Sequence, residues 1–241
     1  MELLQEIKKS LISGEKVNIV FIGDSITSCE WVHPNWREIV EYVLKEEITS
    51  QVPDWKIPSW GIRCFNFAYD GSATEDILGF MPGILNAKPY LAVFLLNTND
   101  RHRKVPLELF EKRVQQILDE LSANCKFVLF GNAIPGNRKE YNEYSREAYA
   151  GVAKKLKLKE NVLFVDTFSE FGKFDLSKLF TFKSEGNEHL GLKKGDIDYV
   201  HPNQLGNAYI AKVFLEHAFG ISFDPERFMK ETLAGEMFPG Y

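Results

Sequence analysis

Five short runs of apolar residues recur along the chain, and nearly every position within each run is apolar. They cover residues 17–22, 64–68, 91–96, 127–130 and 162–165. An uninterrupted apolar run of this length is typical of a strand whose two faces are both covered, as in a parallel sheet. The segments between the runs are long enough to contain crossover helices. The pattern therefore predicts an α/β fold with a five-stranded, mostly parallel sheet.

Stretches with helical character lie between these runs. We expect helices after Pro34, from about Thr74, after Pro106, over residues 141–157 and after Pro202. Proline suits the first turn of a helix, because its missing N–H would have no partner there. Residues 1–16 have the pattern of a charged amphipathic helix, and they lack the apolar core and cleavage site of a secretory signal.

One long segment, residues 168–194, is mostly irregular in its pattern. Segments of this length without regular structure are often lids or binding loops. No linker rich in Gly, Ser or Pro and no block of charge divides the chain. We therefore expect a single domain over residues 1–241.

Composition and charge narrow the possible partners. The chain has 241 residues, of which 44% are hydrophobic and 26% charged, as is ordinary for a globular protein. A net charge of -5 without a basic stripe argues against nucleic-acid binding, and no stretch reaches membrane-spanning length. Cys29, Cys64 and Cys125 have neither paired nor metal-binding spacing, so we expect buried free thiols in a cytoplasmic protein.

Chemically reactive residues stand where the apolar runs end. The sequence places Gly23-Asp24-Ser25 after the first run, Gly71 after the second, Asn97-Thr98-Asn99-Asp100 after the third, and Asp198-Tyr199-Val200-His201-Pro202 before the last of these helices. In open parallel sheets, ligands bind beyond the carboxyl ends of the strands. We therefore expect these segments to share one edge of the sheet.

Ser25, His201 and Asp198 have the chemistry of a nucleophilic triad. A serine hydroxyl is a weak nucleophile at neutral pH, and it needs a neutral imidazole to take its proton as the oxygen attacks. The spacing of Asp198 and His201 lets the carboxylate fold back in a turn and bind one imidazole nitrogen, which leaves the other nitrogen free for Ser25. Asp196 is the alternative acid in this segment.

The same edge carries donors for the negative charge that develops on a carbonyl oxygen during ester cleavage. We expect the N–H groups of Ser25 and Gly71 and the side-chain amide of Asn99 to form this oxyanion hole. Taken singly, each residue also suits an ordinary turn or helix cap. Their arrival at one edge in this order favours catalysis.

The four segments resemble, in order and spacing, the signature blocks of the SGNH hydrolases, also called the GDSL esterase and lipase superfamily. GDSIT resembles the serine block, residues 66–72 the glycine block, NTND the asparagine block and DYVHP the Asp-x-x-His block. The resemblance implies the four name-giving roles for Ser25, Gly71, Asn99 and His201, with Asp198 completing the triad. It also implies a flavodoxin-like, three-layer α/β/α sandwich and no cofactor or metal.

Candidate substrate contacts lie close to these blocks. The family often has glycine where this chain has Asn97, which adds a polar side chain beside Asn99. We expect Asn97, Asp24 and Trp31 to contact substrate, although Asp24 also suits a role in holding the turn through backbone hydrogen bonds. Among the four tryptophans, Trp31 is the pocket candidate, whereas Trp36 is expected to pack in the core.

The sequence thus predicts a serine esterase, with a carbohydrate or small-ester acetyl esterase as the leading hypothesis. A lysophospholipase or thioesterase acting on longer acyl chains is the alternative. A hypothesis of another class is a non-catalytic flavodoxin-like binding module that uses residues 23–27 as a phosphate cradle. The expected partner is a small-molecule ester such as an acetylated carbohydrate, with no nucleic acid and no membrane. A homo-oligomer is compatible with the sequence.

Overall fold

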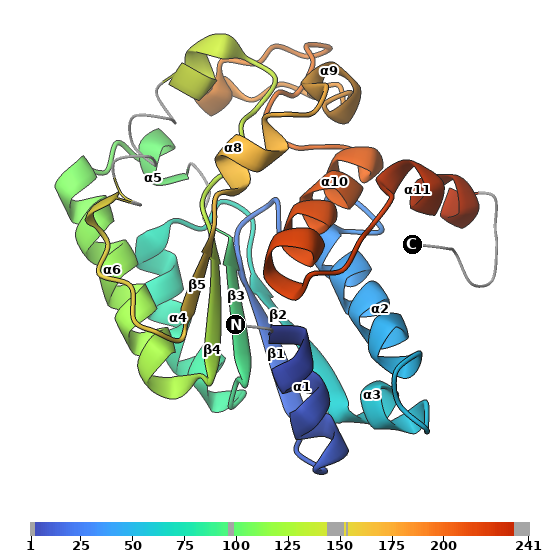
Figure 1. Ribbon diagram of the computed structural model, residues 1–241. Coiled ribbons are helices and arrows are strands. Elements are labelled where there is room, and N and C mark those ends of the chain that lie inside the picture. Colours follow the sequence, from blue (N-terminus) through green and yellow to red (C-terminus); the bar gives the residue numbers. More distant parts are fainter. Residues whose placement is uncertain (1–2, 96–98, 144–151, 153, 234–241) are drawn as a thin grey trace.

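A central sheet of parallel strands forms the middle layer of the computed structural model, which describes residues 3–95, 99–143, 152 and 154–233 (Figure 1). The strands are β1 (Val17–Gly23), β2 (Ile62–Ala68), β3 (Leu91–Leu95), β4 (Phe127–Gly131) and β5 (Val162–Val165). Their order across the sheet is β2-β1-β3-β4-β5, and every neighbouring pair is parallel. This is the flavodoxin-like order, so the predicted sheet is confirmed.

Helices cover both faces of the sheet, as a three-layer α/β/α sandwich requires (Figure 1). One face carries α1 (Leu3–Ile12), α2 (Trp36–Thr49) and α10 (Gln204–Phe214), and the other carries α4 (Thr74–Asn86) and α6 (Leu107–Asn124). The shorter elements are α3 (Lys56–Gly61), α5 (Asn99–His102), α8 (Thr167–Phe171), α9 (Leu176–Leu179), the 3-10 turn η1 (Glu188–Leu190), the π-helical η2 (Leu215–Phe219) and α11 (Pro225–Leu233).

The alternation of side chains along each strand explains the two helical layers. In β1, Ile19 and Phe21 pack in the core beneath α2 and α10, whereas Val20 and Ile22 pack beneath α4 and α6. Every residue of β3 and β4 is buried, because these strands lie inside the sheet with helices on both sides. The edge strand β2 is less covered, and Phe65 is 38% exposed.

The predicted helix starts agree closely with the structure. The helix expected after Pro34 is α2, and those expected from Thr74, after Pro106 and after Pro202 are α4, α6 and α10. The helix expected over residues 141–157 falls mostly outside the described residues. None of the described helices combines the length and the apolar character needed to cross a bilayer.

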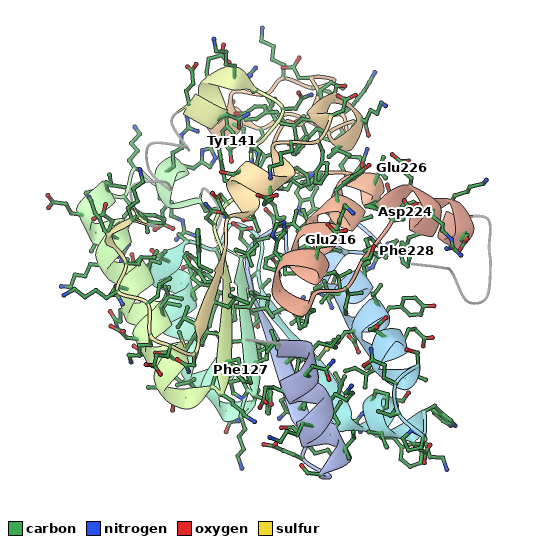
Figure 2. All side chains as sticks on the ribbon, in the orientation of Figure 1. Phe127, Tyr141, Glu216, Asp224, Glu226 and Phe228 are labelled. Atoms are coloured by element: carbon green, nitrogen blue, oxygen red, sulfur yellow. The ribbon has the colours of Figure 1, made fainter. Side chains whose placement is uncertain are left out.

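The C-terminal helix α11 packs on the layer that contains α2. Phe228 of α11 lies with its ring centroid 6.1 Å from that of Tyr42 on α2 and 5.4 Å from that of Phe223 (Figure 2). The same core cluster contains Leu3 of α1. The first and last described helices therefore share one core.

The three cysteines are free, but only one of them is buried. Cys125 is buried in the core beneath α6, and this burial raises the pKa of its thiol to about 12. Cys29 and Cys64 are partly exposed. The prediction of buried thiols is therefore correct for Cys125 and wrong for the other two, which lie in a loop and on the less covered edge strand.

Candidate active site

The turn that carries Ser25 begins where β1 ends. Gly23 is the last residue of the strand, and a Cβ atom there would lie 2.6 Å from the Thr27 hydroxyl and 3.0 Å from the Leu95 carbonyl oxygen of β3. Only glycine fits this close approach. The Asp24 carboxylate then accepts a hydrogen bond from the Ile26 N–H at 3.1 Å, so the turn is closed locally and Ser25 lies at its apex.

The structure brings Ser25, His201 and Asp198 into one chain of hydrogen bonds. His201 Nε2 lies 2.9 Å from Ser25 Oγ, and His201 Nδ1 lies 2.7 Å from Asp198 Oδ2. The other carboxylate oxygen of Asp198 accepts the N–H groups of Val200 at 2.8 Å and of His201 at 3.1 Å. All three predicted residues are at least 90% buried, so these bonds are largely sheltered from competing water.

The environment of Asp198 favours its charged form. Burial alone raises the pKa of this carboxyl, but the hydrogen bond and charge of His201 and the N–H groups of Val200 and His201 outweigh burial, so the pKa is lowered below its ordinary value. A carboxylate that stays ionised accepts the proton on Nδ1 and leaves Nε2 as the acceptor toward Ser25. This geometry is the one that a base toward Ser25 requires.

This lowered pKa predicts a pH-dependent stability. A carboxyl with a lowered folded-state pKa stabilises the fold fully above the ordinary aspartate range, near pH 4, and this contribution is lost as the pH falls through the lowered value. We expect Asp198→Asn to reduce the free energy of unfolding by about 1–3 kcal/mol at pH 5 and by less at pH 3. Urea titrations at both pH values measure the difference, and an equal loss at both would contradict the prediction.

Ser25 and Gly71 line the same cavity, and neither of their backbone N–H groups has a hydrogen-bond acceptor among the described residues. Gly71 has φ +72°, a left-handed conformation that favours glycine. The Arg103 guanidinium donates to the Gly71 carbonyl at 2.7 Å and pairs with Asp76 at 2.6 Å. Arg103 thus fixes the peptide that follows Gly71 and leaves the Gly71 N–H available.

The Asn99 amide lies in the same region but is already hydrogen-bonded. Its Nδ2 donates to Asp24 Oδ2 at 3.0 Å and to the Ser72 carbonyl at 2.9 Å. The next residue, Asp100, is buried and accepts the N–H and the hydroxyl of Thr74 at the start of α4. Burial raises the pKa of Asp100, although the Thr74 hydrogen bonds oppose this. These contacts join the loops after β1, β2 and β3.

These loops surround a cavity of about 500 Å³. It is lined by Ser25, Trp31, Asp70, Gly71, Asn99, His102, Arg103, Asn187, Leu190, Val200 and His201. Trp31, one of the predicted substrate contacts, is therefore in its wall. Asp24 is buried behind the turn and bonded to Ile26 and Asn99, and Asn97 lies outside the described residues. Contact of Asp24 or Asn97 with substrate stays a prediction.

The sequence is similar to those of known hydrolases. The sequence profile of the GDSL-like lipase/acylhydrolase family matches residues 21–209, which include Ser25 and His201. The chain belongs to this family. An acetylxylan esterase from Geobacillus stearothermophilus is 26% identical over 225 residues, which cover 84% of this chain and 93% of that protein.

Solved structures of other proteins have a fold similar to that of this GDSL-like hydrolase. The crystal structure of the Geobacillus acetylxylan esterase aligns with TM-score 0.60 and 21% identity over 86% of this chain and 96% of that one. A lipase/acylhydrolase from Enterococcus faecalis aligns with TM-score 0.60 and 19% identity over 85% and 96% of the two chains. Family membership makes the protein a hydrolase of carboxylic esters.

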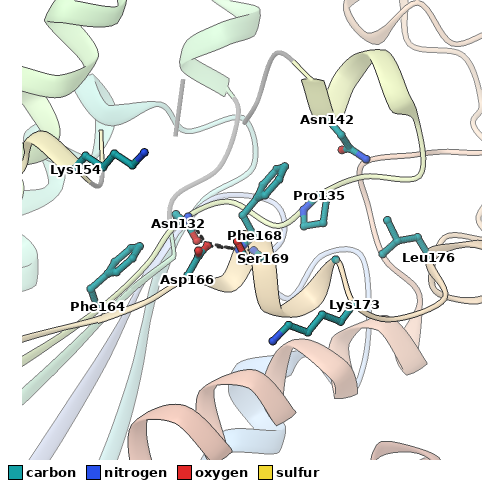
Figure 3. Close-up of a pocket in the computed structure, with 11 residues that line it drawn as sticks. Asn132, Pro135, Asn142, Lys154, Phe164, Asp166, Phe168, Ser169, Lys173 and Leu176 are labelled. Atoms are coloured by element: carbon teal, nitrogen blue, oxygen red, sulfur yellow. Dashed lines mark hydrogen bonds between the residues drawn. The ribbon is translucent and has the colours of Figure 1, made fainter. Parts of the chain in front are cut away.

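A larger cavity, of about 630 Å³, lies beyond the ends of β4 and β5 (Figure 3). Two of its polar wall groups bond each other: Asn132 donates to Asp166 at 3.0 Å, and Asp166 also caps α8 by accepting the Ser169 N–H at 3.1 Å. None of the predicted site residues that the structure describes lines it. The smaller cavity, whose wall includes both Ser25 and His201, is therefore the candidate active site of this GDSL-like hydrolase.

Two buried asparagines brace the turns that hold Ser25 and His201. The Asn35 amide donates to the carbonyls of Ile26 and Ser28 in the serine turn. The next N–H, that of Trp36, donates to Asn207 Oδ1 on α10 at 3.1 Å, and Asn207 Nδ2 donates to the Pro202 carbonyl, beside His201. Trp36 itself is fully buried, as predicted. Neither Asn35 nor Asn207 was recognised from the sequence.

Removal of this brace is expected to destabilise the protein. In Asn207→Ala the buried N–H of Trp36 and the Pro202 carbonyl lose their partner, and we expect a loss of about 2 kcal/mol in the free energy of unfolding. Asn124→Ala is the matched control, because Asn124 is exposed and bonds only within α6. Equal unfolding midpoints for the two variants in urea would show that the brace is unimportant.

Other wall residues were also missed from the sequence. Arg103 belongs to the segment after NTND, and Asn187 and Leu190 come from the irregular segment 168–194. The hypothesis that this segment is a lid or a binding loop is thus supported by these two residues. Among the described residues, no group of three His, Cys, Asp or Glu side chains is placed to share a metal ion.

Proposed function

We propose that this protein is a serine esterase that removes acetyl groups from carbohydrates or similarly small esters through an acyl-enzyme. The observation that carries the proposal is the buried chain of hydrogen bonds from Ser25 through His201 to Asp198 at the wall of a cavity. The same cavity wall includes Gly71, whose N–H is available for an oxyanion. Nucleophile, base and oxyanion donors are the parts that acyl transfer needs.

In the acylation half of the reaction, Ser25 Oγ attacks the carbonyl carbon of the ester while its proton passes to His201 Nε2. The C=O electron pair moves onto the oxygen, which becomes a tetrahedral oxyanion. When the oxyanion collapses, the bond to the alcohol oxygen breaks and His201 gives its proton to that oxygen. The products are the free alcohol and acyl-Ser25, and Asp198 remains ionised beside the imidazolium throughout.

Deacylation repeats these steps with water. His201 Nε2 takes a proton from the water as its oxygen attacks the acyl carbon, and a second oxyanion forms. Its collapse breaks the bond to Ser25 Oγ, which regains the proton from His201, and the carboxylic acid is released. Imidazolium therefore forms in both halves, and Asp198 stabilises it twice in each cycle.

The N–H groups of Ser25 and Gly71 are the proposed primary donors to the oxyanion, because neither is engaged elsewhere among the described residues. The Asn99 amide is the proposed third donor. It reaches the oxyanion by exchanging one of its present partners, Asp24 or the Ser72 carbonyl. A donor that exchanges partners contributes less than one that is free from the start.

We expect Asn99→Ala to lower kcat by about a hundredfold, at the lower end of the range measured for a lost oxyanion donor. Initial rates with 4-nitrophenyl acetate measure this loss, and thermal unfolding checks that the loops remain joined. Asn124→Ala, an asparagine on α6 far from the cavity, is the control. A rate equal to that of the unchanged protein would exclude Asn99 from the oxyanion site.

One comparison supports acetyl esters as the substrate, and another supports the triad. The relative from Geobacillus stearothermophilus is an acetylxylan esterase. Solved structures of that enzyme include catalytic mutants in which a serine, an aspartate and a histidine are each replaced by alanine. The same three residue types form the hydrogen-bonded chain in this protein.

A panel of esters tests the substrate class. The unchanged protein and Ser25→Ala are assayed with acetylated xylose, with 4-nitrophenyl acetate and octanoate, with an acyl thioester and with a lysophospholipid. We expect hydrolysis of the acetyl esters by the unchanged protein only. If kcat/KM instead rises steeply from acetate to octanoate, the lysophospholipase or thioesterase alternative is correct. If no ester is cleaved and a fluorophosphonate does not label Ser25, the binding-module hypothesis is favoured.

The proposal includes a single domain over residues 1–241 in the cytoplasm. The single domain is supported by the core cluster that includes both Leu3 and Met229. The cytoplasmic location rests on the three free cysteines. Limited proteolysis tests the first point, because a single domain should yield no stable internal fragment.

A further inference from the structure

Trp31 lies flat against the imidazole of His201. The two ring centroids are 4.1 Å apart, and the ring planes differ by only 4°. Trp31 is 48% exposed, whereas His201 is 8% exposed. The indole therefore covers one face of the buried imidazole and turns its own other face outward. A half-exposed indole keeps this alignment with the imidazole only if another contact restrains the indole.

The carboxylate of Asp70 holds this indole. The Trp31 indole N–H donates to Asp70 Oδ2 at 2.7 Å, and the hydroxyl of Ser28 donates to Asp70 Oδ1 at 2.6 Å. Ser28 is fully buried in the serine turn. Asp70 is therefore tied to the serine turn through one oxygen and to the indole through the other. Neither of these hydrogen bonds belongs to the catalytic chain.

We propose that Trp31 and Asp70 are positioning residues for His201. Asp70 fixes the orientation of the indole, and the indole fixes the orientation of the imidazole and shields one of its faces. This inference rests on the proposed esterase function. It differs from the expectation that Trp31 contacts the substrate, because the aligned face of the indole is occupied by the base.

The hydrogen bonds of His201 leave one motion free that the indole restrains. The bonds to Ser25 and Asp198 are made at Nε2 and Nδ1. Rocking of the ring about the line that joins these two nitrogens changes neither distance much. Because the Nε2 lone pair lies close to this line, rocking chiefly moves the ring carbons and the plane of the imidazole, and it misaligns the lone pair only slightly. An aromatic ring stacked on the imidazole opposes this rocking. The indole thus controls the one coordinate that the triad bonds do not.

The indole also favours the charged state of the base. Acylation and deacylation both place a positive charge on the imidazole, and the face of an indole attracts such a charge. The other charged and titratable groups that face His201 are Asp198, which is bonded to it, and His102 and Arg103 in the cavity wall. The charge of Arg103 is paired with Asp76. Trp31 and Asp70 therefore add to the stabilisation that Asp198 provides.

Replacement of the indole separates a positioning role from substrate binding. With 4-nitrophenyl acetate, we expect Trp31→Leu to lower kcat by about tenfold and to change KM by less than about twofold. Trp31→Phe retains an aromatic ring and is expected to restore kcat to within about threefold. Trp55→Leu is the matched control, because Trp55 is 56% exposed and contacts Trp60 instead of the active site. A change confined to KM would overturn the proposal and assign Trp31 to substrate binding.

A double-mutant cycle tests whether Asp70 acts through the indole. Asp70→Asn removes the charge that holds the indole N–H, and we expect about a threefold loss of kcat in the unchanged background. In the Trp31→Phe background, which has no N–H to hold, the same substitution should change nothing further. An equal loss in both backgrounds would overturn the proposed route and assign Asp70 to another role, such as support of Gly71.

The rate of fluorophosphonate labelling at Ser25 distinguishes failure of this inference from failure of the proposed function. Labelling requires an activated serine but no particular ester. If the unchanged protein neither labels nor hydrolyses esters, the esterase function and this inference both fail. If the unchanged protein labels and Trp31→Leu labels equally fast, only the inference fails. We expect labelling of Trp31→Leu to be about tenfold slower, with unfolding temperatures close to that of Trp55→Leu.

Discussion

Replacement of Ser25 by alanine is expected to lower kcat for 4-nitrophenyl acetate by on the order of 10⁴- to 10⁶-fold and to abolish labelling by a fluorophosphonate. In the proposed mechanism Ser25 Oγ is the atom that becomes acylated, so no covalent intermediate is expected without it. Ser25 lies 2.9 Å from His201 Nε2. Because alanine keeps the backbone N–H of residue 25, the oxyanion donors survive, and any remaining rate reflects them and substrate binding alone.

His201→Ala is the companion variant, and the Ser25→Ala/His201→Ala double variant completes the test. Because serine and imidazole transfer one proton between them, the double variant should be no slower than Ser25→Ala alone. Ser122→Ala, a serine whose hydroxyl bonds only within α6, is the control and should retain full activity. Losses that multiply in the double variant would show that the two residues do not share one proton.

Asp198→Asn is expected to cost about ten-thousandfold in kcat, although it changes only one atom of the carboxylate. An amide at this position presents an N–H to the imidazole or a neutral oxygen to its Nδ1–H. The first favours the tautomer whose proton lies on Nε2, which cannot accept the serine proton, and the second stabilises imidazolium poorly. The backbone bonds from Val200 and His201 can still form, so the turn should remain.

Asp196→Asn is the matched control for this prediction. Asp196 stands two residues away and was the alternative acid in the sequence, but its Oδ2 accepts the Lys193 N–H at 2.8 Å within an exposed turn. We expect Asp196→Asn to hydrolyse 4-nitrophenyl acetate at the rate of the unchanged protein. If Asp196→Asn were inactive and Asp198→Asn active, the assignment of the acid would be reversed.

The sheet could be predicted from sequence because its strands are hidden on both faces. Every position of β3 and β4 is buried, so an uninterrupted apolar run was sufficient to find them. The edge strand β2 begins earlier than its run, at Ile62, and includes the exposed Arg63. Its first residues are fixed by pairing with β1, and a pairing partner cannot be inferred from local polarity.

The candidate site was also predictable in outline, because parallel strands deliver the residues that follow them to one edge. That reasoning placed Ser25, which follows β1, at this edge, and the segment before the last predicted helix was expected to bring His201 there too. The structure has the two side chains in contact. It could not foresee that the amide of Asn99 is hydrogen-bonded to Asp24 and Ser72. Side-chain direction depends on neighbours that are remote in sequence, so a residue can be placed at an edge without its partners being known.

The stacking of Trp31 on His201 and the clamp of Asp70 lay beyond sequence reasoning for the same reason. Four tryptophans follow the serine turn, and the sequence offers no signal that one of them reaches the imidazole across 170 residues. The brace at Asn207 could not be predicted from sequence for a different reason. An asparagine inside a helix usually faces solvent, whereas this one is buried and joins α10 to the start of α2.

The separation of Ser25 and His201 along the chain by 176 residues has a consequence for biosynthesis. Translation delivers the first strand long before the last helices, and domains begin to form from the N-terminal side. Under the proposed roles, a nascent chain that has not yet reached His201 contains the nucleophile without its base, so we expect it not to hydrolyse esters. Hydrolytic activity is therefore expected only after the last part of the chain has been synthesised and has folded.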